Sequence, residues 1–196
     1  MGKLTMNVGP MFSGKTTALQ QQGEKHIRHG HKVIFLKYLN DTRYSKNYIV
    51  SHNGVSVKAK NILDTIYIEE VLSADIILID EVQFLPISII DEVWRLLAKG
   101  KTIYCSGLDM DFRGKGFETT MELLAIADKV NKFSSVCKCC GADATMSSKK
   151  VDDNQIVDLG AEEKYFPTCR TCFLIRKQNS KTYGNMKGKG EECWLL

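Results

Sequence analysis

Several features are scarce or missing in this 196-residue chain, and each absence narrows its class. Apolar runs such as Ile76–Ile79 are far shorter than the roughly 18 residues that a membrane-spanning helix needs. The first residues enter a strand-like pattern at once, which predicts that there is no secretory signal peptide. Met6 stands where a myristoylation motif requires serine or threonine. These absences argue against a membrane-spanning protein, a secreted protein and a lipid-anchored protein.

Charge of one sign is not in large excess either. The 27 lysines and arginines against 23 acidic residues leave a net charge of +4. This balance permits anionic ligands but does not demand nucleic acid as a partner. The hydrophobic fraction of 43% is typical of a globular protein. A chain of this length can bury roughly 70% of its unfolded surface, so we expect one domain, alone or with a small appendage.

The seven cysteines are an odd number, which argues against a framework made only of disulfides. Four of them form two CxxC pairs, Cys137 with Cys140 and Cys169 with Cys172. Without a secretory signal, two such pairs indicate a metal site in a reducing compartment, with disulfides or chance spacing as the alternatives. Four thiolates suit tetrahedral Zn²⁺ and leave no open coordination position, so we expect a structural zinc.

Strand-like and helix-like segments alternate over the first two thirds of the chain, which predicts an α/β core with a mostly parallel sheet. A hairpin is also expected around the Asn53–Gly54 turn signal, with flanks at 48–50 and 55–57. The expected strands are residues 3–8, 32–38, 75–79 and 101–106, and the expected helices are residues 17–29, 68–74, 86–99 and 118–129.

The alternation stops near residues 130–135, where cysteines, polar loops and short β-like runs replace it. We therefore predict an α/β domain at residues 1–133 and a small metal-binding domain at residues 134–176. The remaining residues, 177–196, are polar and rich in glycine, and we expect a mobile tail there.

A phosphate-binding motif, G-x-x-x-x-G-K-[ST], is matched in full between an expected strand and an expected helix. Its glycines let the backbone approach phosphate oxygens, and the helix N-terminus adds partial positive charge. We expect Lys15 to contact the β- and γ-phosphates and the Thr16 hydroxyl to bind Mg²⁺. The motif indicates a nucleoside triphosphate but not the fate of its γ-phosphate. The phosphate loop comprises Gly9, Pro10, Met11, Phe12, Ser13, Gly14, Lys15 and Thr16.

Two adjacent carboxylates, Asp80 and Glu81, follow the apolar strand of residues 75–79. We expect Asp80 to help hold Mg²⁺ at the carboxyl edge of the sheet, where ligands bind in such folds. An acid directly after it can face the γ-phosphate and accept a proton from the attacking group. That group is water in an ATPase and a substrate hydroxyl in a kinase. The alternative is that Glu81 is a helix-start or surface acid.

Residues 3–175 resemble the type II thymidine kinases, the cellular, zinc-containing enzymes with a RecA-like core. The last matching segment is the most specific, because a glycine, an acid, a tyrosine and a CxxC pair all fall at the family's spacing. The segments that carry the resemblance are Gly9–Thr16, Lys37–Tyr44, Asp80–Phe84, Gly107–Arg113 and Gly160–Phe173.

The resemblance implies transfer of the ATP γ-phosphate to the 5′-hydroxyl of thymidine, giving dTMP, with Glu81 as general base. It implies that Asp41 and Arg43 lie near the phosphates, that Gln83 contributes to the nucleotide site and that Cys137, Cys140, Cys169 and Cys172 bind zinc. The nucleoside-site residues that it implies are Met11, Phe84, Leu108, Phe112, Ser147, Ile156, Val157, Asp158, Leu159, Gly160 and Tyr165. Ser147 and Lys149 depart from the family's common threonine and arginine.

The resemblance also implies the surroundings of the enzyme: ATP and Mg²⁺, a homotetramer, inhibition by dTTP and a cytoplasmic location. Neither nucleic acid nor a membrane is an expected partner. Zinc at both ends of the 141–168 segment would make a lasso that closes over a nucleoside and excludes water. Two alternatives stay open, a kinase of a broader range of pyrimidine deoxynucleosides and a RecA-like ATPase with a nucleic-acid-binding zinc ribbon.

Overall fold

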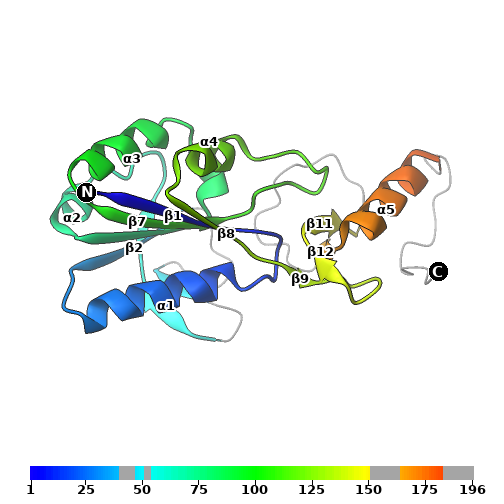
Figure 1. Cartoon of the computed structure of the whole chain (residues 1–196), viewed down its shortest axis with the longest axis horizontal. Coiled ribbons are helices and arrows are strands. Elements are labelled where there is room, and N and C mark those ends of the chain that lie inside the picture. The colour runs from blue at the N-terminus through cyan, green and yellow to red at the C-terminus, as the bar shows by residue number, and fades with distance from the viewer. Residues whose placement is uncertain (40–46, 51–53, 151–163, 183–196) are drawn as a thin grey trace.

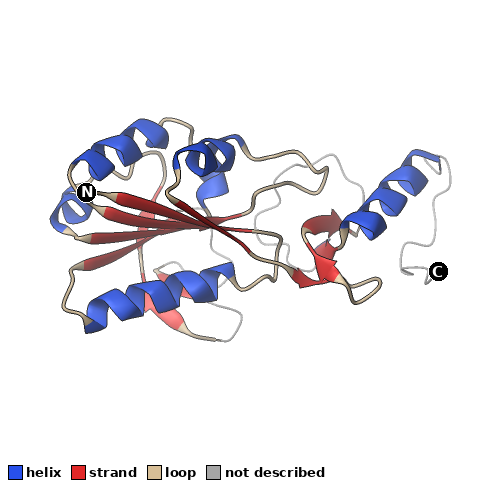
Figure 2. Ribbon diagram, viewed as in Figure 1, coloured by secondary structure: helices blue, strands red, loops and turns tan. Residues whose placement is uncertain are grey.

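The computed structural model describes residues 1–39, 47–50, 54–150 and 164–182. Its centre is a six-stranded sheet in the order β5-β2-β6-β7-β1-β8, in which every neighbouring pair is parallel (Figures 1 and 2). The predicted α/β class with a mostly parallel sheet is therefore confirmed. The strands are β1 (Lys3–Val8), β2 (Val33–Tyr38), β5 (Lys60–Ile62), β6 (Ile76–Asp80), β7 (Thr102–Gly107) and β8 (Lys129–Lys132).

Helices cover both faces of the sheet (Figure 2). One face carries α1 (Lys15–Arg28) and the antiparallel hairpin of β3 (Tyr48–Val50) and β4 (Ser56–Lys58). The other face carries three further helices and the 3₁₀ turn η1. These elements are α2 (Glu69–Ser73), η1 (Val82–Phe84), α3 (Ile89–Ala98) and α4 (Glu118–Ile126).

The side chains on the two faces of β6 belong to two separate apolar clusters. Ile77 and Ile79 pack on the side of α3 and α4, whereas Leu78 packs with Leu19 of α1. Because successive side chains of a strand point to opposite faces, a central strand covered on both sides reads as one continuous apolar run. This burial places Asp80 and Glu81 directly where the strand leaves the core.

The predicted helix at residues 118–129 is wrong in its last turn. Helix α4 ends at Ile126, and β8 begins at Lys129 as an edge strand of the sheet. Val130 is the one apolar side chain in β8, and it is 46% exposed. An edge strand with so little apolar content shows no alternation of period two, so hydrophobic patterning could not identify it. The three-residue strand β5 was missed for the same reason.

A smaller unit, which we call the cysteine module, follows β8. It contains β9 (Ser135–Val136), β10 (Asp143–Ala144), β11 (Met146–Lys149), β12 (Tyr165–Thr168) and α5 (Arg170–Thr182). In Figure 1 it lies beyond the carboxyl ends of the parallel strands. Helix α5 continues past residue 176, and the predicted domain limits stay a prediction. Among the described residues, every helix is too short or too polar to cross a bilayer.

Candidate functional site

The phosphate loop connects β1 to α1 and depends on two glycines. Gly9 has φ +150°, and a Cβ there would lie 2.4 Å from the carbonyl oxygen of Phe133. Gly14 has φ +84° and is the residue that precedes α1. Only glycine adopts these backbone angles at little cost, so the loop can turn sharply and present N–H groups at the helix start.

Lys15 and Thr16 are the first two residues of α1. The Lys15 ammonium donates to the Pro10 carbonyl at 2.6 Å and to the Ser13 hydroxyl at 3.4 Å, so it lies across the loop. The Thr16 hydroxyl donates to Asp80 Oδ2 at 3.2 Å. A threonine hydroxyl beside a carboxylate is the oxygen pair that Mg²⁺ needs in a phosphate-loop site.

Asp80 is itself held by a group from the neighbouring strand β7 and by the backbone that directly follows β6. Its Oδ1 accepts from the Ser106 hydroxyl, at the end of β7, and from the Glu81 backbone N–H at 3.1 Å. Both Asp80 and Ser106 are buried. Sequence reasoning missed Ser106, although a serine at the carboxyl end of the expected strand of residues 101–106 was a usable signal.

Glu81 leaves β6 with φ 57° and ψ 43°, in the left-handed region. A residue other than glycine rarely adopts this conformation, and it persists only where the surroundings hold it. Glu81 therefore precedes η1, as the alternative of a helix-start acid anticipated, but its backbone is strained rather than ordinary. Its carboxylate accepts a hydrogen bond from the Gln83 amide.

Contacts between distant segments join the cysteine module to the phosphate loop. The Met11 backbone N–H donates to the Ser147 hydroxyl at 3.2 Å, and the Ser135 hydroxyl donates to the Phe12 carbonyl at 3.1 Å. The Phe133 N–H donates to the Val8 carbonyl at 2.7 Å. Met11 and Ser147, both expected beside the nucleoside, are thus brought together.

Two aromatic rings and one cation form the next part of the site. The Phe112 ring lies 6.3 Å from the Tyr165 ring between centroids. The ammonium of Lys149 lies 5.1 Å from the Phe112 centroid and 5.5 Å from the Tyr165 centroid. Lys149 is only 7% exposed and is the register partner of Tyr165 in the β11–β12 pair. Its cation–π contacts connect a loop of the core to the cysteine module.

The loop that carries Phe112 is held by contacts within the loop and by contacts from α5. The buried Asp111 carboxylate accepts from the Arg113 N–H at 2.8 Å and from the Lys115 N–H at 2.9 Å, and it forms an ion pair with the Arg113 guanidinium. From α5, Lys177 donates to the Arg113 carbonyl at 2.9 Å. Phe173 of α5 packs close to Gly114. The loop is therefore held by local hydrogen bonds and by the cysteine module together.

The remaining described candidates lie around η1 and the end of β7. Leu108 donates its backbone N–H to the side-chain amide oxygen Oε1 of Gln83 at 3.0 Å. The Phe84 ring packs 5.7 Å from the Tyr38 ring, toward the larger apolar cluster. Five nucleoside-site candidates and two phosphate-site candidates lie outside the described residues: Ile156, Val157, Asp158, Leu159, Gly160, Asp41 and Arg43.

The four cysteines of the CxxC pairs form one cluster. Their sulfur atoms all lie within 4.8 Å of one another, and Cys140 Sγ is 3.6 Å from Cys169 Sγ. Four sulfurs at about 2.3 Å from a tetrahedral ion are about 3.8 Å apart, so the donor set fits an ion of that kind. Two short loops supply them, one between β9 and β10 and one at the start of α5. The predicted metal site is thereby confirmed as a cluster.

Backbone N–H groups around the cluster favour the charged, thiolate form of Cys137. Burial raises the pKa of Cys137, but N–H groups of Cys169, Cys140 and Cys139 outweigh it and lower that pKa to about 6. Burial and the neighbouring sulfurs raise the pKa of Cys172 to about 12. Metal ions bind thiolates, so the lowered pKa of Cys137 favours the form of this sulfur that can bind a metal.

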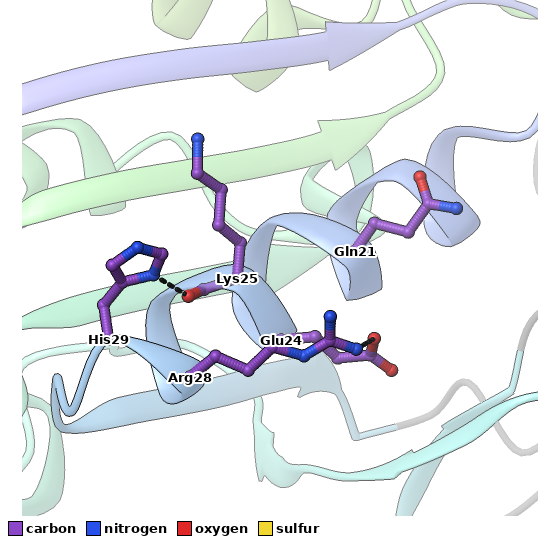
Figure 3. A pocket seen from close by; sticks show the side chains of 5 residues that line it. All are labelled: Gln21, Glu24, Lys25, Arg28 and His29. Atoms are coloured by element: carbon purple, nitrogen blue, oxygen red, sulfur yellow. Dashed lines mark hydrogen bonds and ion pairs between the residues drawn. The ribbon is translucent and has the colours of Figure 1, made fainter.

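A surface depression at the C-terminal half of α1 is separate from this site (Figure 3). In it, Arg28 pairs with Glu24 at 3.6 Å, and His29 Nδ1 lies 2.7 Å from the Lys25 carbonyl oxygen. At about 1.5 Å per residue, His29 is about 20 Å along the helix from Lys15. The depression is lined by Gln21, Glu24, Lys25, Arg28 and His29.

Comparisons with known proteins agree with this geometry. A family model described as thymidine kinase matches residues 2–173. A protein named thymidine kinase from Pseudothermotoga lettingae is 40% identical over 186 residues, which covers 88% of this chain and 95% of that protein. The match spans both the phosphate loop and the four clustered cysteines.

Proposed function

The chain belongs to the thymidine kinase family, and we propose that Glu81 is the general base with which it phosphorylates thymidine. The reaction transfers the γ-phosphate of ATP to the thymidine 5′-hydroxyl and gives dTMP. A general base must lie beside the phosphate-binding groups and face the attacking hydroxyl. Glu81 follows the carboxylate that holds Thr16, and its own carboxylate is held at a defined position. This placement carries the proposal.

The phosphate loop binds ATP through its backbone N–H groups, with Lys15 at the β- and γ-phosphates. Thr16 and Asp80 would hold Mg²⁺, which neutralises charge on the phosphates when it is bound. The 3.2 Å contact between their oxygens supports this assignment. Asp41 and Arg43 would complete the phosphate site, as the resemblance implies.

The nucleoside would lie between the core and the cysteine module. Met11 and Ser147 approach it from the phosphate-loop side, and Phe112 and Tyr165 supply aromatic walls. Leu108 and Phe84 would border the sugar and base, and the main chain of residues 156–160 would hydrogen-bond the base. Closing these walls over the nucleoside excludes water, which limits hydrolysis of ATP.

The metal in the cysteine cluster is proposed to be structural Zn²⁺. Four sulfur ligands leave no open coordination position, so the ion would pin the ends of the 141–168 segment and take no part in phosphate transfer. We keep the domain division at residues 1–133, 134–176 and 177–196 as part of this proposal. Thiolate ligands favour a reducing compartment, so we propose a cytoplasmic location. A homotetramer inhibited by dTTP follows from the family resemblance alone.

The first experiment tests the acceptor. ATP-dependent transfer is measured with thymidine, deoxyuridine, deoxycytidine and single-stranded DNA, each supplied separately. We expect ADP release coupled to dTMP formation with thymidine. Equal rates with all pyrimidine deoxynucleosides would favour the broader kinase, and ADP release stimulated only by DNA would favour the ATPase.

The same assay with Glu81→Gln tests the proposed base. This variant should bind ATP normally and lose about 10²–10⁴-fold in turnover, the usual contribution of general base catalysis. Unchanged turnover would remove Glu81 from this role.

A further inference from the structure

The side-chain amide of Gln83 is engaged at both ends. Its Oε1 accepts from the Leu108 backbone N–H at 3.0 Å, and its Nε2 donates to the Glu81 carboxylate. The Leu108 N–H can only donate, so the amide oxygen must face it. This requirement fixes the amide orientation and turns the NH₂ group toward Glu81.

The Gln83 amide has room because the residue beside it, Gly107, has no side chain. A Cβ at Gly107 would lie 2.6 Å from Gln83 Oε1 and 2.9 Å from a methyl group of Val82. Gly107 ends β7, and β7 is the neighbour of β6. Gln83 itself is 7% exposed. The amide is therefore enclosed between two adjacent strand ends and is not a surface side chain that happens to reach Glu81.

The backbone of Glu81 is also held, but by a different group. Its N–H donates to Asp80 Oδ1, which fixes the left-handed turn. Three side-chain torsion angles separate the Glu81 carboxylate from this backbone, so the carboxylate can move even when the backbone is fixed. A misplacement of 1 Å in a catalytic group can lower the reaction rate about 10²-fold. Gln83 acts on this outer end, whereas Asp80 acts on the backbone.

We propose that Gln83 is a positioning residue that aims the Glu81 carboxylate and ties its position to Leu108, on the nucleoside side. The inference rests on the proposed role of Glu81 as general base. The phosphates are held by the separate phosphate loop, so the loss of Gln83 should lower kcat and leave ATP binding in place. Gln83 thus acts through Glu81 and does not touch the reacting atoms itself.

Two variants separate the two bonds. Gln83→Met removes both and keeps a similar shape, whereas Gln83→Glu keeps an acceptor for the Leu108 N–H but cannot donate to Glu81. We expect kcat at saturating thymidine to fall about 10–100-fold in both, with the KM and Kd for ATP within about twofold of the parent protein. Gln21→Glu, the same chemical change on the exposed depression of α1, should leave all these constants unchanged (Figure 3).

A double-mutant cycle distinguishes positioning from a structural role. If Gln83 acts through Glu81, then Gln83→Met should cause no further loss of kcat in the Glu81→Gln protein. Additive losses would overturn the proposal, as would loss of ATP binding in both Gln83 variants. If Gln83→Met fails to fold, the same cycle is run with Gln83→Glu.

The cycle also separates this inference from the proposed function. Impaired Glu81→Gln with unimpaired Gln83 variants would overturn the positioning role alone. Unimpaired Glu81→Gln would overturn the assignment of the base and the positioning role with it.

Discussion

The sheet and the cysteine module are stabilised by different means. In the sheet, apolar side chains such as Leu4, Ile77 and Ile103 have no exposed surface, and each contributes about 1.5–3 kcal/mol through burial. In the described part of the cysteine module, only short side chains and a few larger ones such as Met146 and Phe173 are buried. A structural metal ion contributes on the order of 10 kcal/mol to a small domain.

The difference matters for function because, in the function proposed above, the two regions hold different parts of the reaction. The sheet presents the phosphate loop and Glu81 at its carboxyl edge, and the cysteine module brings Ser147 and Tyr165 against that edge. Perturbing the cysteine module should therefore affect mainly the nucleoside end, whereas perturbing the sheet should affect the nucleotide end together with core residues of the nucleoside end such as Leu108 and Phe112.

The largest expected effect comes from removing the metal. Cys169→Ser should release the ion and disorder the cysteine module, since one of four mutually close sulfurs is lost. Thymidine affinity should fall by about 10²-fold or more, because the aromatic wall loses its support. ATP affinity should stay within about twofold. Metal analysis and calorimetric titration with each ligand measure the three quantities.

The neighbouring exposed Thr171 supplies the control for that experiment. Thr171→Ser alters the same CxxC loop without removing a sulfur, so metal content and both affinities should be unchanged. Normal thymidine affinity in metal-free Cys169→Ser would show that the cysteine module is not needed to bind the nucleoside.

The next effect concerns the apolar core. Leu78→Ala removes a side chain with no exposed surface and should lower the free energy of unfolding by about 2–5 kcal/mol. Val136→Ala, at a position 67% exposed in the cysteine module, should change it by about 0.5 kcal/mol or less. Urea denaturation of both variants provides the comparison. Similar losses would contradict the view that the regions differ in their source of stability.

The parts of the fold that could be predicted from the sequence are those with strong local signals. The apolar run before Asp80 needs two covered faces, and the glycine-lysine motif needs a strand before it and a helix after it. Thr16 and Asp80 could be expected to meet, because the carboxyl ends of parallel strands share one edge of the sheet. The cysteine pairs likewise specify a cluster by their spacing.

Other features depend on register between distant segments, which local patterns do not encode. The Gln83–Leu108 bond requires β6 and β7 to be neighbours, and Lys149 meets the rings only because it is opposite Tyr165 in the β11–β12 pair. Nothing in the sequence predicted the left-handed backbone conformation of Glu81, because glutamate rarely adopts this conformation. Sequence reasoning could thus name most of these residues but not the contacts that position them.

A smaller effect is expected at the junction of the two regions. Lys149→Met removes the cation that lies over Phe112 and Tyr165, and such contacts are worth about 1 kcal/mol. Thymidine affinity should fall about fivefold, with ATP affinity unchanged. Lys149→Arg keeps a cation over the rings and should bind thymidine like the parent protein. If the methionine variant binds equally well, the cation does not support the aromatic wall.

The smallest effect is a dependence of core stability on pH. His26 of α1 lies 2.9 Å from the Tyr104 hydroxyl, and burial, followed by the nearby charges of His31, Lys25 and His29, lowers its pKa below 6.5. A lowered pKa means that the unfolded chain binds the proton more readily than the folded chain. The contribution of His26 is therefore complete above about pH 6.5 and declines as the pH falls below that value.

This contribution belongs to the sheet region, so it should not depend on the metal. His26→Gln keeps a hydrogen-bonding amide near Tyr104 but does not titrate, and the free energy of unfolding should change less between pH 7 and pH 5 than in the parent protein. Metal release at low pH also destabilises the chain, because thiolates take up protons. The comparison is therefore repeated in the Cys169→Ser protein. A difference that vanished in that background would assign the pH dependence to the cysteine module instead of α1.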